Sequence, residues 1–220
     1  MPWLFLLIVL LVCLALCAVG FYKFVYFLSI GYGFAVAGGG IAIFIIALAN
    51  GWLTSTPLLL LALAQMVLFI AYGARLSGFL LVREIKNAAY RKTLAEATGS
   101  EGPVVVKFFM WLTMGVLYVS QTSGVAFRLF NGEAASACQW IGIAISAFGI
   151  GLETVADQQK SQQKAKRPDM VATEQLYKIV RCPNYFGEIL FWTGVTVSAL
   201  DCLAGIGQWI TVIIAYILIV

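Results

Sequence analysis

The sequence predicts an all-α, polytopic membrane protein with about seven transmembrane helices and an N-terminus outside the cytoplasm. Hydrophobic residues make up 62% of the 220-residue chain and charged residues only 11%, which gives a mean hydropathy of +0.95. Several apolar runs approach the roughly twenty residues that a helix needs to cross a bilayer. Basic residues gather in alternate connections between these runs, as expected of loops that stay in the cytoplasm.

Each of the apolar segments is expected to form one helix. The segments cover approximately residues 3–22, 25–48, 58–82, 104–127, 135–155, 186–200 and 204–220. The first segment lacks the positive residues that open a secretory signal, so we interpret it as a transmembrane helix. The whole chain, residues 1–220, is expected to be a single membrane domain with N-terminal helices in 1–82 and a second part in 104–220.

The distribution of basic residues predicts the topology. Residues 83–102 and 157–181 carry most of them, whereas residues 50–57 and 128–136 hold only Arg128. The positive-inside rule therefore places the two basic connections and Lys23 in the cytoplasm. The same charge bias fits a bacterial inner membrane and the endoplasmic reticulum.

Small residues crowd the second and fifth segments. No GxGxxG fingerprint follows a predicted strand, so close packing between helices is the better interpretation of these residues. They are Gly31, Gly33, Gly38, Gly39 and Gly40 in the second segment, and Gly142, Ser146, Gly149 and Gly151 in the fifth.

Several classes of function lack support in the composition. The chain has no histidine, and its five cysteines form no CxxC pair, so neither a metal site nor a Cys/His nucleophile is expected. No basic run with interleaved aromatic residues indicates nucleic-acid binding. Acid–base chemistry would have to use Tyr, Glu, Asp, Lys or Cys side chains.

Three groups of polar residues occupy the predicted cytoplasmic ends of helices. Tyr72 and Arg75 are three residues apart on the third segment, and Asn184 and Glu188 are four apart at the start of the sixth. A helix that continues out of the membrane would align a third group along one stripe. That group is Glu153, Asp157, Lys160 and Lys164. We expect the three groups to converge on one pocket.

Structural interpretations of these residues remain open beside the functional one. Arg75 would extend to the interface or anchor the topology, the stripe would form i,i+4 ion pairs on a solvated helix, and Tyr72 would be an ordinary core aromatic. Glu188 is harder to explain in this way, because a carboxyl group among apolar neighbours in a membrane segment is functional by default. Once protonated, such a group can donate a hydrogen bond to a carbonyl.

The segment RCPNYFGE, residues 181–188, resembles the R-H-P-N-Y-F-G-E signature of the steroid 5α-reductase-like membrane reductases, in particular the DUF1295 branch. Residues 153–160 resemble the acidic and Gln-Lys segment of that branch, residues 176–178 resemble its lead-in to the signature, and residues 72–75 are similar to its Y-x-x-R. The resemblance is densest from about residue 150 to 195.

This resemblance implies NADPH-dependent reduction of a carbon–carbon double bond conjugated to a ketone, in a sterol-like or other lipophilic substrate that arrives from the bilayer. Glu188 and Tyr72 would then hydrogen-bond the carbonyl oxygen, and Asn184 would hold the nicotinamide carboxamide. The remaining contacts with the cofactor would come from Arg75, Asp157, Lys160, Lys164, Arg181 and Tyr185.

Two features depart from the family pattern. Cys182 replaces the histidine of the signature, and the family's polar cytoplasmic tail is not found after the apolar residues that end at Val220. Without such a tail the NADPH site is expected to be incomplete. Two alternatives therefore stay open, an S-adenosylmethionine-dependent methyltransferase of the isoprenylcysteine type and a non-catalytic lipid-binding membrane protein.

Overall fold

The computed structural model describes residues 2–86, 103–167 and 170–220. The all-α prediction is confirmed, since every regular element within these ranges is helical. In chain order the elements are α1 (Pro2–Cys17), η1 (Ala18–Phe21), η2 (Phe24–Leu28), α2 (Ile30–Ala49), α3 (Thr56–Lys86), α5 (Val104–Asn131), α6 (Ala137–Lys166), α7 (Leu176–Ile179), α8 (Pro183–Val197) and α9 (Ile206–Ile217).

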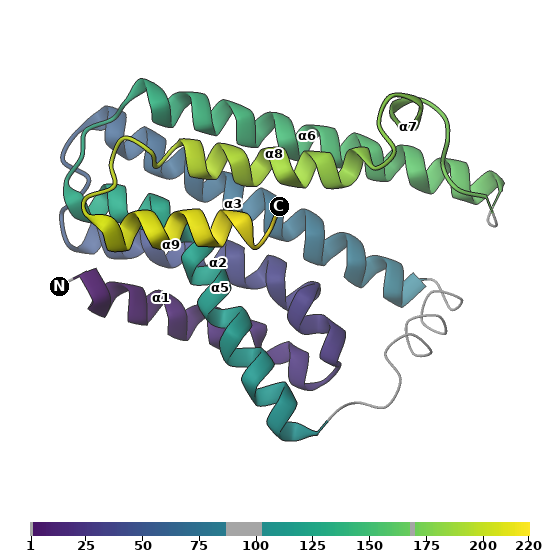
Figure 1. The fold of residues 1–220 in the computed structure, drawn as a ribbon, viewed down its shortest axis with the longest axis horizontal. Coiled ribbons are helices and arrows are strands. Elements are labelled where there is room, and N and C mark those ends of the chain that lie inside the picture. The colour runs from purple at the N-terminus through teal and green to yellow at the C-terminus, as the bar shows by residue number, and fades with distance from the viewer. Residues whose placement is uncertain (1, 87–102, 168–169) are drawn as a thin grey trace.

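The long helices run roughly along one axis, with α5 oblique to the others (Figure 1). In the described part of the chain, five segments are long and apolar enough to cross a membrane: Leu4–Phe21, Phe24–Ala49, Thr56–Lys86, Val104–Asn131 and Ala137–Lys166. These correspond to the first five predicted segments. The chain is therefore a multi-pass membrane protein by the length and composition of its helices.

The seventh predicted segment forms a shorter helix than expected, and the helix of the sixth begins earlier, at Pro183. Helix α8 has 15 residues and α9 has 12, both below the length of a simple membrane crossing. Turns from residue 198 to 202 end α8, and Gly205, with φ of +81°, precedes α9. Other boundaries also differ from the prediction, because 3-10 turns η1 and η2 join α1 to α2 and α6 continues to Lys166.

Helices α6 and α8 lie side by side (Figure 1) and approach each other through small residues. A Cβ atom on Gly149 would lie 2.5 Å from the Phe191 backbone nitrogen, and one on Gly187 would lie 2.7 Å from that of Glu153. The predicted packing role is thus confirmed for Gly149, and Gly142 behaves in the same way against Gly194. It is wrong for Gly151, which has no atom within 4 Å of its Cβ position.

The glycines of α2 serve a similar purpose. A Cβ atom on Gly33 would lie 2.8 Å from the carbonyl oxygen of Gly73 on α3. This close approach brings the residues next to the two glycines, Tyr32 and Tyr72, into edge-to-face contact with ring centroids 5.8 Å apart.

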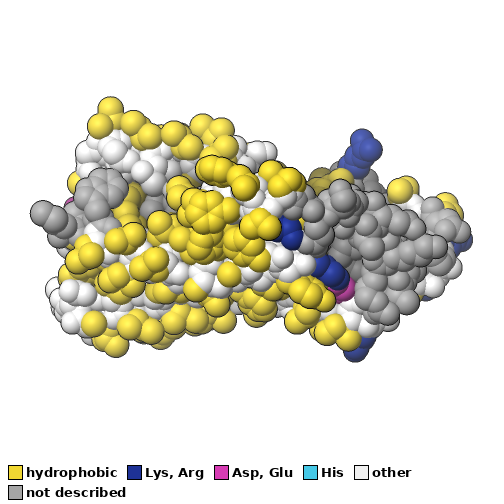
Figure 2. Space-filling model, turned by 90° about the horizontal axis from the view of Figure 1, so that it is seen from below, with side chains coloured by type: hydrophobic (Ala, Val, Ile, Leu, Met, Phe, Trp, Pro, Cys, Tyr) yellow, Lys and Arg dark blue, Asp and Glu magenta, His cyan; other side chains and the backbone are white. Residues whose placement is uncertain are grey.

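Basic residues of the described chain gather at one end of the molecule. Lys23, between η1 and η2, forms an ion pair with Glu84 near the end of α3, so the connection from α1 to α2 lies at the same end as the basic residues that follow. Figure 2 shows apolar side chains over most of one face, with Lys and Arg side chains toward this end. Arg91 and Lys92 fall outside the described residues.

Candidate active site

Tyr72 and Glu188, predicted from the sequence to share a site, are in direct contact. The Tyr72 hydroxyl donates a hydrogen bond of 2.7 Å to Glu188 Oε1. Tyr72 is fully buried, and its ring stacks on Phe191 with centroids 4.3 Å apart and planes 2° apart. Because Phe191 follows Glu188 by three residues, both lie on the face of α8 that meets α3. The geometry of the carboxyl group is thus set by two neighbouring helices.

Arg75 makes contacts that the sequence did not predict. Its guanidinium donates to Asp157 Oδ2 at 2.7 Å and also forms an ion pair with Glu153. The two acids are four residues apart and face α3 from the same side of α6. Arg75 is therefore more than a simple interface anchor, because two carboxylates of α6 match its charge. Buried Arg75 Nε and Glu153 Oε2 still lack hydrogen-bond partners within the described residues.

A polar cavity of about 600 Å³ opens between α3, α6 and α8. Seven of the nine predicted site residues line it: Arg75, Asp157, Lys160, Lys164, Asn184, Tyr185 and Glu188. Tyr72 lies behind Glu188 and does not reach the cavity. Arg181 is exposed and lies outside the lining, so the structure does not bring it to this site.

The cavity has an excess of positive charge. Its lining adds Arg83 and Lys86 to the three predicted cations. Arg75 is matched by two carboxylates, whereas Lys86, Lys160 and Lys164 form no ion pair within the described part of the chain. Such an arrangement of ammonium groups suits an anionic ligand that carries phosphates.

A second cavity, of about 710 Å³, lies between α5, α9 and the start of α2. Its walls are mostly apolar side chains, including Leu28, Met114, Leu117 and Ile214. Among the residues described, Glu188 alone lines both this apolar cavity and the cationic one. The Glu188 carboxyl group therefore stands at the boundary between a charged compartment and a hydrophobic one.

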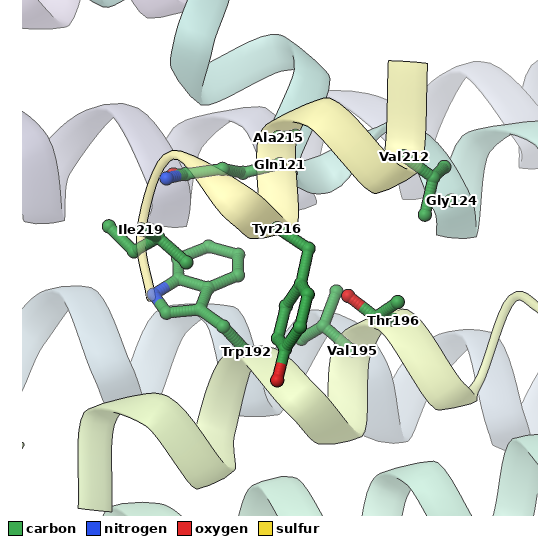
Figure 3. A pocket seen from close by; sticks show the side chains of 9 residues that line it. All are labelled: Gln121, Gly124, Trp192, Val195, Thr196, Val212, Ala215, Tyr216 and Ile219. Atoms are coloured by element: carbon green, nitrogen blue, oxygen red, sulfur yellow. The ribbon is translucent and has the colours of Figure 1, made fainter. Parts of the chain in front are cut away.

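A much smaller void adjoins the apolar cavity (Figure 3). It has about 10 Å³, room for about one water molecule. Trp192 and Tyr216 reach it from the facing helices α8 and α9 (Figure 3). The Trp192 indole nitrogen and the Gln121 amide are buried there without protein partners in the described chain, which fits a buried water.

The segment between α6 and α8 is held to α6 by glutamines of the Gln-Lys segment. Gln159 Oε1 accepts a 3.1 Å hydrogen bond from the Leu176 backbone, and Gln163 Oε1 accepts one of 2.9 Å from the Thr173 backbone. The Tyr177 hydroxyl donates to Ala156 O at 3.3 Å, and burial, with a smaller effect of the Asp157 charge, raises the pKa of Tyr177 to about 12. These contacts hold α7 against α6.

The structure adds site residues that sequence reasoning missed. Glu153 appeared only as part of the acidic stripe, and Arg83 and Lys86 only as markers of topology. Tyr32, in the wall of the apolar cavity, was overlooked because it stands in a glycine-rich helix that indicates packing. Its position directly before Gly33 was the available signal, since a close helix approach brings the adjacent side chain near the neighbouring helix.

The fold and this site allow comparison with known proteins. The family described as "Protein of unknown function (DUF1295)" matches residues 33–220. The chain belongs to the DUF1295 family. The match includes α3, α6, α8 and α9, and so nearly all residues of the two cavities. No curated protein and no solved structure matches the chain.

Proposed function

We propose that this DUF1295 member is a steroid 5α-reductase-like enzyme that uses NADPH to reduce a carbon–carbon double bond conjugated to a ketone in a steroid-like or other lipophilic substrate. One observation carries the proposal: Glu188 lines both a cationic cavity and an apolar cavity. A reaction between a polyanionic dinucleotide and a lipid-soluble molecule needs two such compartments that meet at one reactive group.

The residues of the cationic cavity fit a dinucleotide. Lys86, Lys160 and Lys164 would hold its phosphates, and the Asn184 amide would hold the nicotinamide carboxamide. Arg75, fixed by Asp157 and Glu153, retains a buried Nε donor without a partner in the described chain, which the cofactor would satisfy together with Tyr185. When bound, NADPH supplies the hydride.

The chain's own contribution is to bind and polarise the ketone. A protonated Glu188 carboxyl would donate a hydrogen bond to the ketone oxygen, and so stabilise the enolate that forms when hydride adds to the β-carbon. A proton from solvent would then add to the α-carbon and complete the reduction. Tyr72 holds the carboxyl in place from behind. The apolar walls exclude water, which strengthens these interactions.

The proposal also assigns the two ends of the molecule to the two sides of the membrane. The cationic cavity would face the cytoplasm with the N-terminus outside, since Lys23 and the ends of α3 and α6 share one end of the molecule. Helices α8 and α9 would complete seven membrane-embedded helices. The membrane would be a bacterial inner membrane or the endoplasmic reticulum.

The test uses the full chain in lipid nanodiscs with NADPH and an enone ketone such as 4-cholesten-3-one. We expect NADPH oxidation that falls by about 100-fold in Glu188→Gln, because the amide cannot provide the acidic proton donor. Glu174→Gln is the control, since Glu174 is exposed and lies outside both cavities.

Full activity in Glu188→Gln would contradict the proposed role of this residue. Binding of S-adenosylmethionine in place of NADPH would instead support a methyltransferase. Binding of neither cofactor would leave a lipid-binding protein.

A further inference from the structure

The apolar cavity contains six polar side chains, and almost all of them have partners inside the protein. Three helix hydroxyls donate to backbone carbonyls of the preceding turn at 2.8 to 2.9 Å: Thr113 to Phe109, Ser120 to Val116 and Thr211 to Gly207. These groups are saturated by their own helices. They offer little to a ligand.

The other three polar groups of the cavity differ in whether they have a hydrogen-bond partner. The Tyr118 hydroxyl donates to Phe27 O, and Glu188 accepts from Tyr72. Tyr32 is 6% exposed, and its hydroxyl, although close to the Tyr72 hydroxyl and the Trp192 indole, makes no hydrogen bond of ordinary geometry within the described residues. A buried hydroxyl without a partner is costly, so such groups are uncommon in native proteins.

The Tyr32 ring is held firmly in place. It stacks on Tyr118 with centroids 4.8 Å apart and planes 18° apart, and on Trp192 at 6.3 Å and 15°. The Tyr72 ring packs edge-on against the Tyr32 ring. Gly33, the next residue in the chain, packs closely against Gly73 of α3. The position of the Tyr32 hydroxyl oxygen in the cavity wall is therefore fixed.

We propose that the Tyr32 hydroxyl donates a hydrogen bond to an oxygen of the lipophilic molecule that occupies the apolar cavity. The ligand class is a largely hydrocarbon molecule with an acceptor oxygen near Glu188. Because this inference rests on the proposed function for the identity of that oxygen, it assigns the ketone two donors, Glu188 and Tyr32. Tyr72 then acts as a positioning residue, since its hydroxyl is already used by Glu188.

A binding role and a structural role for Tyr32 predict opposite effects on stability. Removing an unsatisfied buried hydroxyl relieves a desolvation cost, so the ligand-free Tyr32→Phe protein should melt at the same temperature as the wild type or higher. The matched control is Tyr216→Phe, whose hydroxyl is paired with Thr193 Oγ1 at 2.9 Å outside the apolar cavity. That variant should melt at a lower temperature.

The test compares 4-cholesten-3-one with the hydrocarbon 4-cholestene as ligands, in nanodiscs without NADPH, using tryptophan fluorescence. We expect the wild type to prefer the ketone and Tyr32→Phe to lose about three- to tenfold of that preference. Tyr216→Phe should keep the wild-type preference. An unchanged preference in Tyr32→Phe, no preference in the wild type, or a lower melting temperature of Tyr32→Phe would each overturn the inference.

The outcome is distinguishable from that of the proposed reductase. Loss of the ketone preference in Tyr32→Phe, together with no NADPH oxidation by the wild type, would support the Tyr32 site and contradict the reductase. NADPH oxidation with an unchanged KM for the ketone in Tyr32→Phe would contradict the Tyr32 site and leave the reductase intact.

Discussion

Glu188 and Tyr72 have different roles at the level of single residues. Glu188 reaches both cavities, whereas Tyr72 is buried behind it and makes its hydrogen bond to the carboxyl oxygen. The ion pairs of Arg75 with Glu153 and Asp157 lie one helical turn further along. Glu188 and Arg75 are therefore each held by a polar group from another helix.

Tyr72→Phe should reduce kcat by about tenfold to 100-fold, because the carboxyl of Glu188 loses the donor that orients it. The fold should persist, since the stacking on Phe191 is kept. Steady-state kinetics and thermal melting test this. Tyr26→Phe is the matched control, because Tyr26 donates a bond of the same 2.7 Å length to Glu84 outside both cavities. Equal losses of kcat in the two variants would contradict the role of Tyr72.

At the scale of elements, the contact between α6 and α8 positions the site. The backbones approach so closely at Gly149 and Gly187 that both helices reach α3, where Glu188 contacts Tyr72 and the acids of α6 contact Arg75. At the opposite end, Arg128 of α5 is buried and donates to Ser198 O at 3.1 Å and to Asp201. This second cluster ties α5 to the connection between α8 and α9.

Gly149→Ala should lower the free energy of unfolding by about 1–3 kcal/mol, because its methyl group would meet backbone atoms that cannot move aside. Gly151→Ala in the same helix should be neutral or stabilising by up to about 1 kcal/mol, since its Cβ position is open. Denaturation in mild detergent compares the two. Equal stability of both variants would show that the α6–α8 contact is looser than described.

The lowered pKa of the Asp201 carboxyl predicts that the protein loses stability in acid. Its burial acts to raise the pKa of the carboxyl, but hydrogen bonding by Ser136 and the charge of Arg128 outweigh this and hold the pKa below its ordinary value of 3.8. The stabilisation is thus complete above pH 3.8 and is lost as the pH falls through the lower folded value. Melting of the wild type and Asp201→Asn should converge toward low pH. A difference that stays constant down to about pH 3 would contradict this.

At the scale of the whole molecule, charge is segregated along the axis of the helices. The cationic cavity lies at the end that carries Lys23 and the ends of α3 and α6, and the apolar cavity lies between α5 and α9. An anionic cofactor would enter from water and a lipophilic substrate from the membrane. Neither would cross the compartment of the other.

The double variant Lys160→Gln/Lys164→Gln should weaken NADPH binding by about tenfold or more, since two charged contacts with phosphate are lost. Wild-type affinity should also fall as salt is added. Lys166→Gln/Lys178→Gln carries the same change of charge on exposed residues outside the cavity. Equilibrium titration would contradict the assignment if both double variants bound NADPH equally well.

The sequence allowed much of the fold and part of the site to be predicted. Hydropathy and charge predict the five long helices. Helical spacing and the expected topology place Tyr72 and Glu188 at the same end of their helices. The ion pairs of Arg75 were not predictable, because a 4-3-4 stripe fits pairing within α6 as well as pairing with α3. The role of Tyr32 depends on whether a hydroxyl finds a partner, which is a property of the packed structure and not of local sequence.

The most direct test of the central claim follows the hydrogen that would pass between the two cavities. The full chain in nanodiscs is supplied with 4-cholesten-3-one and NADPH that carries two deuterium atoms at C4 of the nicotinamide, and the product is analysed by mass spectrometry. The account predicts a saturated ketone that carries deuterium at the former β-carbon, formed about 100-fold more slowly by Glu188→Gln. A saturated ketone without deuterium, or no reduction of the enone at all, would contradict it.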